Sequence, residues 1–92
     1  MNKTILITGA TSGIGKATAE FLASQGARLI LCGRRQERLD ALKEELPNEV
    51  HTLNFDVRNR AAVFEAIDSL PDAFTPIDVL INNAGNAHGL DD

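Results

Sequence analysis

The stretch that decides the fold is Thr8-Gly9-Ala10-Thr11-Ser12-Gly13-Ile14-Gly15. The β-branched apolar run from Thr4 to Thr8 leads into it and is typical of a strand that is buried on both faces. A helical pattern follows and ends at Gly26, and its apolar face consists of Ile14, Ala17, Phe21 and Leu22. Where a strand passes through a glycine-rich turn into a helix, unpaired N–H groups and the positive end of the helix dipole converge. The stretch therefore predicts a binding site for a phosphate or pyrophosphate.

The overall composition is that of one small soluble domain. The 92 residues are 43% hydrophobic and 24% charged, which excludes disordered and fibrous classes. No apolar run is long enough to span a membrane, and the first strand follows Met1 to Lys3 without the apolar core of a signal peptide. A net charge of −4 disfavours nucleic acid as a partner. We therefore expect a cytoplasmic protein with neither a membrane nor a nucleic acid as partner.

Strands and helices alternate along the rest of the chain. Further strands are predicted at Ala27 to Gly33, Val50 to Val57 and Pro76 to Ile81. Two further helices are predicted from apolar faces, Leu39, Leu42 and Leu46 in one and Val63, Ile67 and Leu70 in the other, which has an N-cap at Asn59. Such alternation favours right-handed crossovers and a parallel sheet. The predicted fold is an α/β, Rossmann-type doubly wound parallel sheet, β-α-β-α-β-α-β, with strand order 3-2-1-4.

The glycines are spaced Gly9-x-x-x-Gly13-x-Gly15, which differs from the G-x-G-x-x-G of the commoner dinucleotide fingerprint. The physical needs are similar, since Gly9 would permit a tight turn, Gly13 close approach of the ligand and Gly15 close helix packing. A P-loop is the rival phosphate site, but Ala10 replaces its first glycine and Ala17 its magnesium-binding hydroxyl. A turn without ligand is the other alternative, which the hydroxyl residues Thr11 and Ser12 between the glycines disfavour.

Two motifs together resemble the short-chain dehydrogenase/reductase family. Thr8 to Gly15 resembles its T-G-x-x-x-G-I-G signature, and Asn82-Asn83-Ala84-Gly85 resembles its N-N-A-G. More narrowly, Gly33 to Leu39 and Asp56 to Arg60 resemble the NADP-dependent branch that oxidises 3-hydroxy acids and serine. The resemblance implies that residues 1–92 are the N-terminal dinucleotide-binding part of a single Rossmann domain, and that the catalytic C-terminal part is absent.

The end of the second predicted strand, Gly33-Arg34-Arg35, bears on the choice of cofactor. An acidic residue there would hold the ribose 2′-OH of NAD and repel a 2′-phosphate. Arg34 and Arg35 would instead pair with a phosphate dianion, and Gly33 leaves space for it. The alternative is a solvated first helical turn, although the helix dipole disfavours cations at that end. We therefore predict NADP rather than NAD.

The resemblance also assigns roles to the ends of the third and fourth strands. Asp56 would accept a hydrogen bond from the adenine amino group while the Val57 backbone contacts the ring edge; alternatively, Asp56 starts the turn into the next helix. Asn82 to Gly85 would contact the cofactor ribose and brace the central strands, and a plain strand-ending turn is the alternative. The predicted cofactor-binding residues are Gly9, Ala10, Thr11, Ser12, Gly13, Ile14, Gly15, Arg34, Arg35, Asp56, Val57, Asn82, Asn83, Ala84 and Gly85.

No catalytic residue and no metal ligand is predicted in this chain. The family's proton transfers use a tyrosine, a lysine four residues later and a serine, and this sequence contains no tyrosine. By resemblance, the parent protein is an NADP-dependent oxidoreductase, a homotetramer that transfers hydride between NADP(H) and a small hydroxy substrate such as a 3-hydroxy acid. The chain would then be an inactive fragment. The alternative is a stand-alone, non-enzymatic module that binds or senses NADP(H).

Three further expectations concern single residues and the fourth strand. Cys32 lies in an apolar run and is expected to be a buried strand residue, whereas His51 and His88 are expected at the surface. If the chain ended at residue 92, the fourth strand would have an unpaired edge, and its run Val79-Leu80-Ile81 would invite aggregation. A stand-alone module would be expected to blunt that edge, which favours the fragment.

Overall fold

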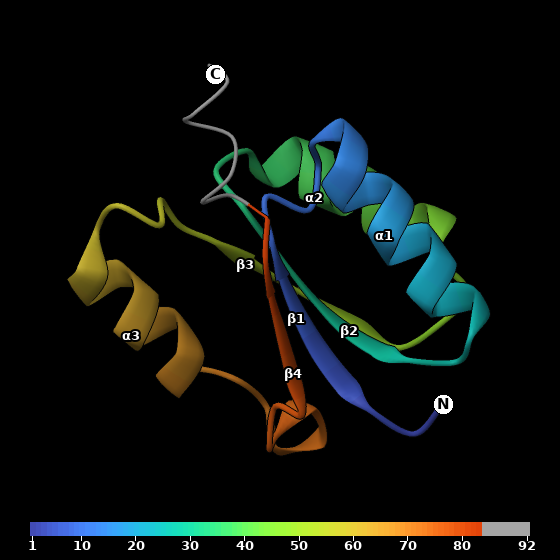
Figure 1. The fold of residues 1–92 in the computed structure, drawn as a ribbon. Coiled ribbons are helices and arrows are strands. Elements are labelled where there is room, and N and C mark those ends of the chain that lie inside the picture. The colour runs from blue at the N-terminus through green and yellow to red at the C-terminus, as the bar shows by residue number, and fades with distance from the viewer. Residues whose placement is uncertain (84–92) are drawn as a thin grey trace.

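A computed structural model describes residues 1–83, in which four parallel strands form a sheet with helices on both faces (Figure 1). The sheet order is β3-β2-β1-β4, which confirms the predicted strand order 3-2-1-4. The elements along the chain are β1 (Thr4–Thr8), α1 (Gly13–Ser24), β2 (Arg28–Gly33), α2 (Gln36–Glu45), β3 (Val50–Asn54), α3 (Arg60–Asp68), the 3-10 turn η1 (Asp72–Phe74) and β4 (Val79–Asn82). Among these elements, no helix is long and apolar enough to cross a membrane.

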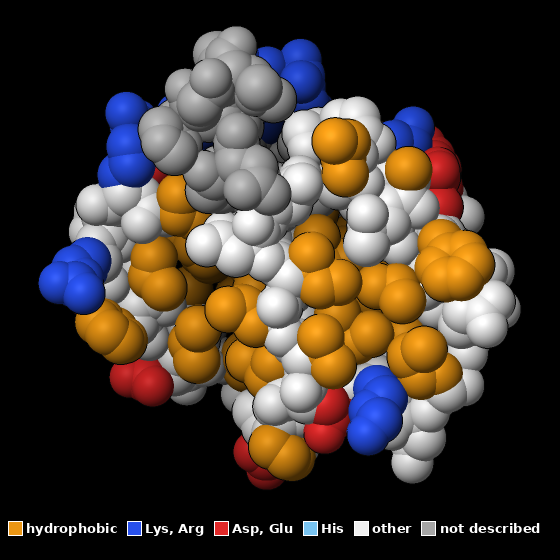
Figure 2. All heavy atoms as spheres, in the orientation of Figure 1, with side chains coloured by type: hydrophobic (Ala, Val, Ile, Leu, Met, Phe, Trp, Pro, Cys, Tyr) orange, Lys and Arg blue, Asp and Glu red, His pale blue; other side chains and the backbone are white. Residues whose placement is uncertain are grey.

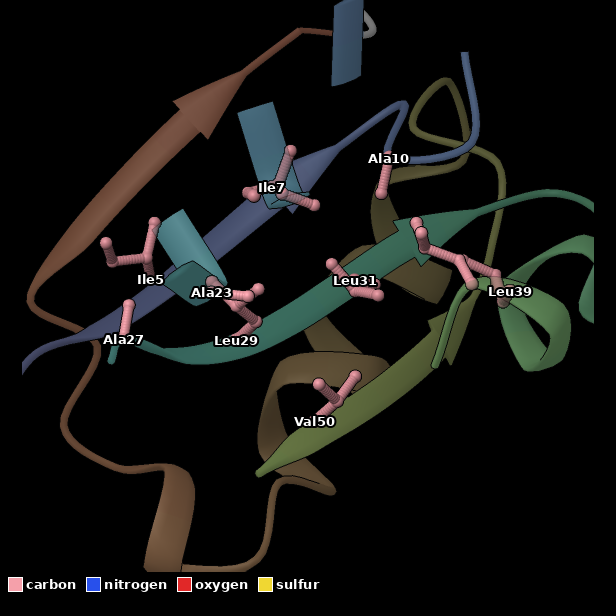
Figure 3. Packing of buried hydrophobic residues seen from close by; sticks show 11 residues of the cluster. Ile5, Ile7, Ala10, Ala23, Ala27, Leu29, Leu31, Leu39 and Val50 are labelled. Atoms are coloured by element: carbon pink, nitrogen blue, oxygen red, sulfur yellow. The ribbon is translucent and has the colours of Figure 1, made fainter. Parts of the chain in front are cut away.

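Two apolar clusters hold the helices to the sheet. The strand residues alternate between its faces, because successive side chains of a strand point to opposite sides. On one face, α1 and α2 cover a cluster that includes Ile7, Leu29 and Leu31, part of which Figure 3 shows. On the other face, α3 and η1 cover a cluster that includes Leu6 and Ile30. The central strands β1 and β2 are thereby buried on both sides, as their continuous apolar runs predicted.

Helix α1 lies on the sheet through small residues. Its buried positions are Gly15, Ala19 and Ala23, which allow the helix axis to approach the strands closely. Of the predicted apolar face, Leu22 packs against the cluster between α1 and the sheet, whereas Ile14 is 72% and Phe21 63% exposed. Figure 2 shows apolar side chains gathered on this side of the molecule. An open groove runs between this face and the last strand, and it is lined by Gly13, Ile14, Ala17, Thr18, Phe21, Leu22 and Ile81.

The bounds of β3 and β4 differ most from the predicted ones. β3 stops at Asn54, opposite Gly33, the last residue of β2, so the predicted continuation to Val57 has no ladder to join. β4 begins at Val79, paired with Ile5, rather than at Pro76. The caps agree with prediction: the Asn59 side chain accepts from Ala62 N–H at the start of α3. Gly26, with φ of 86°, follows the C-cap of α1.

Candidate functional site

The turn after β1 depends on a glycine at its first position. Gly9 has a φ of 61°, in the left-handed region that other residues rarely adopt. The next residue, Ala10, is buried, and its N–H donates to the Cys32 carbonyl at 3.0 Å. The turn is therefore fixed to the carboxyl end of β2, and the tight turn expected at Gly9 is confirmed.

Helix α1 begins directly after this turn with its N-terminus open. The Ser12 hydroxyl donates to the Gly9 carbonyl at 2.8 Å and accepts from Gly15 N–H at 3.4 Å. The N–H groups of Gly13 and Ile14 donate to no acceptor among residues 1–83. Free amides at the positive end of a helix dipole form a site for an anion. The geometry here suits a phosphate oxygen.

Two glycines of the signature have different surroundings. A Cβ atom on Gly15 would lie 2.1 Å from the Gly9 carbonyl oxygen, so a side chain would force the helix off the turn. This confirms the close packing predicted at that position. A Cβ atom on Gly13 would meet nothing within 4 Å, so this position borders open space at the helix terminus. Gly13 thus leaves room for a ligand to approach the free amides.

Two asparagines join the end of β4 to β1 and to the glycine turn. The Thr8 hydroxyl donates to the Asn82 side-chain oxygen at 2.8 Å. The Asn83 amide donates to the Ser12 hydroxyl at 2.9 Å and to the Gly9 carbonyl at 3.2 Å. The predicted bracing of the central strands is therefore present, while contact with a ribose stays a prediction. Ala84 and Gly85 lie outside the described residues, as does His88.

The two arginines lie at the carboxyl end of β2, on the same edge of the sheet as the glycine turn. Arg34 follows β2, and Arg35 is the N-cap residue of α2 without a side-chain cap bond. Both side chains are exposed, and that of Arg35 makes no ion pair or hydrogen bond with the described part of the chain. A Cβ atom on Gly33 would lie 3.3 Å from Leu39, so this glycine makes room for α2 as well as for the site edge.

Asp56 lies beside Arg34 and starts a turn. Phe55 N–H donates to the Gly33 carbonyl at 3.0 Å, which holds the segment after β3 against the end of β2. The Asp56 carboxylate accepts from the Arg58 backbone N–H at 2.9 Å, and the Arg58 Nη2 lies 2.7 Å from Oδ2. Arg34 Nη1 lies 3.9 Å from the same Oδ2. The turn-forming role of Asp56 is therefore present, while its contact with adenine stays a prediction, as does that of Val57.

Hydrogen bonds set the protonation state of Asp56. The side-chain hydrogen bonds from Arg58, followed by its backbone hydrogen bond, lower the pKa of Asp56 to about 2. The carboxylate is therefore charged at neutral pH. Arg58 was not among the predicted site residues; the signal for it was the Asp-x-Arg spacing at a strand end, where an Asp side chain bonds the backbone two residues on.

Cys32 and His51 do not add chemistry to this edge. Cys32 is buried in β2, as predicted, and burial raises the pKa of its thiol to about 12, which makes it a poor nucleophile. His51 is half-buried rather than fully at the surface, with its ring 5.5 Å from that of Phe74. Burial, and then the nearby charge of Lys43, lower the pKa of His51.

A parallel α/β sheet with a glycine turn and an open helix N-terminus at its carboxyl edge defines a nucleotide-binding fold. Residues 3–91 match the family described as short chain dehydrogenase, and the chain belongs to that family. The narrower resemblance is confirmed as well, since its similar proteins include serine and 3-hydroxy acid dehydrogenases.

Two curated relatives are about half identical to this chain. Serine 3-dehydrogenase from Rhizobium radiobacter is 51% identical over 89 residues, covering 97% of this chain and 36% of that protein. The NADP-dependent 3-hydroxy acid dehydrogenase YdfG from Salmonella typhi is 52% identical over 87 residues, covering 95% of this chain and 35% of that protein. The chain thus spans about a third of the length of the relatives that it matches.

Solved structures of related enzymes share the fold. Serine dehydrogenase from Escherichia coli aligns with a TM-score of 0.80 at 45% identity, over 87% of this chain and 36% of that one. A closed form of serine dehydrogenase complexed with NADP+ aligns with a TM-score of 0.79 at 45% identity, over 87% of this chain and 32% of that one.

Proposed function

We propose that residues 1–92 are the N-terminal dinucleotide-binding part of a single Rossmann domain, in an NADP-dependent oxidoreductase that acts on a small hydroxy substrate. The observation that carries this proposal is the pairing of two anion sites on one sheet edge: the open N-terminus of α1 and the arginines after β2. The similar proteins are NADP-dependent or serine dehydrogenases, which supports serine or another 3-hydroxy acid as the substrate class.

Each group of residues has its own part in binding NADP(H). The free amides of Gly13 and Ile14 hold the pyrophosphate, and Arg34 and Arg35 hold the 2′-phosphate. Asp56 and Val57 contact the adenine. Asn82 to Gly85 contact the cofactor ribose, and the bonds from Asn83 keep the glycine turn in place. When bound, the nicotinamide supplies or accepts the hydride, and the fold positions it.

The chain alone is inactive in this proposal. The sequence has no tyrosine to move the substrate proton, so hydride transfer needs residues that these 92 do not include. A homotetramer is a prediction for the longer protein. The relatives are enzymes, which does not favour a stand-alone sensing module.

Fluorescence titration of the chain with NADPH and NADH tests the cofactor assignment. We expect NADPH to bind at least about tenfold more tightly, because charge-assisted hydrogen bonds to the 2′-phosphate are lost in NADH. The double variant Arg34→Ala, Arg35→Ala should lose that preference. Arg38→Ala is the matched control, since Arg38 is an exposed arginine of α2 that lies beyond the strand end. Equal affinity of the unchanged chain for the two nucleotides would contradict NADP.

A further inference from the structure

The Asp56 carboxylate presents a difficulty for binding a 2′-phosphate at this edge. Its Oδ2 lies 3.9 Å from Arg34 Nη1, the same guanidinium that would hold the phosphate. A fixed negative charge at that distance repels a second anion and neutralises the cation between them. Protonation does not relieve the repulsion, because the pKa of Asp56 is about 2.

Arg58 supplies the compensating charge. Its Nη2 lies 2.7 Å from Oδ2, and its Nε lies 3.1 Å from Oδ1 and 3.2 Å from Oδ2 of Asp56. This is a two-pronged contact that uses both carboxylate oxygens, and it is the closer of the two ion pairs of Asp56 within residues 1–83. The backbone N–H of Arg58 also donates to Oδ1 of this carboxylate, at 2.9 Å.

We infer that Arg58 is a positioning residue that sets cofactor preference: by neutralising Asp56, it leaves the charges of Arg34 and Arg35 available to the 2′-phosphate. The inference rests on the proposed function, because it concerns the same site. Arg58 itself need not touch the cofactor. Without Arg58, the Asp56 carboxylate pairs with Arg34. The sheet edge then attracts the 2′-phosphate less strongly, because the charge of Arg34 is partly neutralised.

The test compares two nucleotides that differ only in the 2′-phosphate, adenosine 2′,5′-bisphosphate and adenosine 5′-monophosphate. Their affinities for the chain are measured by calorimetry or NMR titration, and the ratio cancels contributions from adenine and the 5′-phosphate. Arg58→Ala should lower the preference for the bisphosphate by about threefold to tenfold, which is the order expected for one exposed charge acting over a few ångströms in water. A second variant, Asp56→Asn with Arg58→Ala, removes both charges and should restore the ratio.

Arg60→Ala is the matched control. Arg60 is exposed, begins α3 and makes no ion pair with the described part of the chain, so its loss changes net charge by the same amount without freeing Asp56. A merely structural role of Arg58 would weaken both nucleotides equally and leave the ratio unchanged, which would overturn the inference. A ratio that stays low in the Asp56→Asn, Arg58→Ala variant would overturn it as well. If the unchanged chain shows no preference or no binding, the proposed function fails and the inference fails with it.

Discussion

The centre of the sheet and its β4 side have similar sequences and different surroundings. Ile5-Leu6-Ile7 in β1 and Val79-Leu80-Ile81 in β4 are both apolar runs of adjacent, paired strands. In β2, on the other side of β1, Leu29 is fully buried, whereas Leu80 in β4 is 61% exposed. An apolar run therefore indicates that a strand is able to be buried, whereas the neighbouring strands and helices determine whether its side chains are buried. Within residues 1–83, only β1 pairs with β4.

The largest expected effect comes from truncating a leucine on each side of this comparison. Leu29→Ala should lower the free energy of unfolding by about 2–5 kcal/mol, because it leaves a cavity between β2 and the covering helices. Leu80→Ala should change it by less than about 0.5 kcal/mol, because the side chain is already in water. Urea denaturation measures both. If Leu29→Ala fails to fold while Leu80→Ala folds, the expectation is met. Equal destabilisation by the two substitutions would contradict the difference in burial between β2 and β4.

Two glycines at the start of α1 differ in the same way, since Gly15 is closely packed and Gly13 borders open space. Gly15→Ala should cost about 2 kcal/mol or more, since its Cβ would lie 2.1 Å from the Gly9 carbonyl oxygen. Gly13→Ala meets open space and should be neutral or stabilising by up to about 1 kcal/mol, because alanine favours the helix. Thermal unfolding followed by circular dichroism compares them. A Gly15→Ala variant as stable as the unchanged chain would show that the turn and helix are not packed as described.

The exposed apolar side should also make the chain self-associate. Ile14, Phe21 and Leu80 are exposed on α1 and β4, and β4 has one edge without a partner among the described strands. Leu80→Lys should reduce the concentration-dependent association seen by sedimentation, because a lysine on an edge strand opposes strand pairing. Because the side chain at position 80 is already exposed to solvent, the free energy of unfolding should stay the same in this variant. Unchanged association of the Leu80→Lys variant would show that the chain does not self-associate through the edge of β4.

The smallest effect concerns the charged turn that follows β3. Because the folded-state pKa of Asp56, about 2, lies below its ordinary 3.8, the Arg58 contact stabilises the folded chain above about pH 4. That contribution is lost as the pH falls from about 4 to 2. NMR titration of the Asp56 carboxyl should show this low pKa, and Arg58→Ala should return it toward 3.8. An unshifted pKa in the unchanged chain would contradict the contact.

Most of the fold follows from local sequence, and the misses have physical causes. β1 has the predicted bounds, and strand order follows from alternating units and the glycine turn. The length of β3 was wrong because it depends on where its neighbour β2 ends. The three-residue η1 was missed because it is too short to show periodicity. The exposure of Ile14 and Phe21 could not be predicted, since helical spacing identifies a face but not what covers it.

The candidate site also contains features that the sequence predicted and one that it did not. The turn at Gly9 and the close packing at Gly15 were predicted because each is a backbone requirement that favours glycine. The bracing by the side chains of Asn82 and Asn83 was predicted from the resemblance of their motif to N-N-A-G. The Arg58 contact with Asp56 was not predicted, because it depends on side-chain geometry in a turn.

The most direct test of the account is an NMR titration of the ¹⁵N-labelled chain with NADPH. If this sheet edge holds the cofactor, we expect shifts at the amides of Gly13 and Ile14 and at Arg34 and Arg35, with little change at Leu29 in the sheet centre. Shifts confined to other residues, or an unchanged spectrum at millimolar NADPH, would contradict the claim that this sheet edge holds the cofactor.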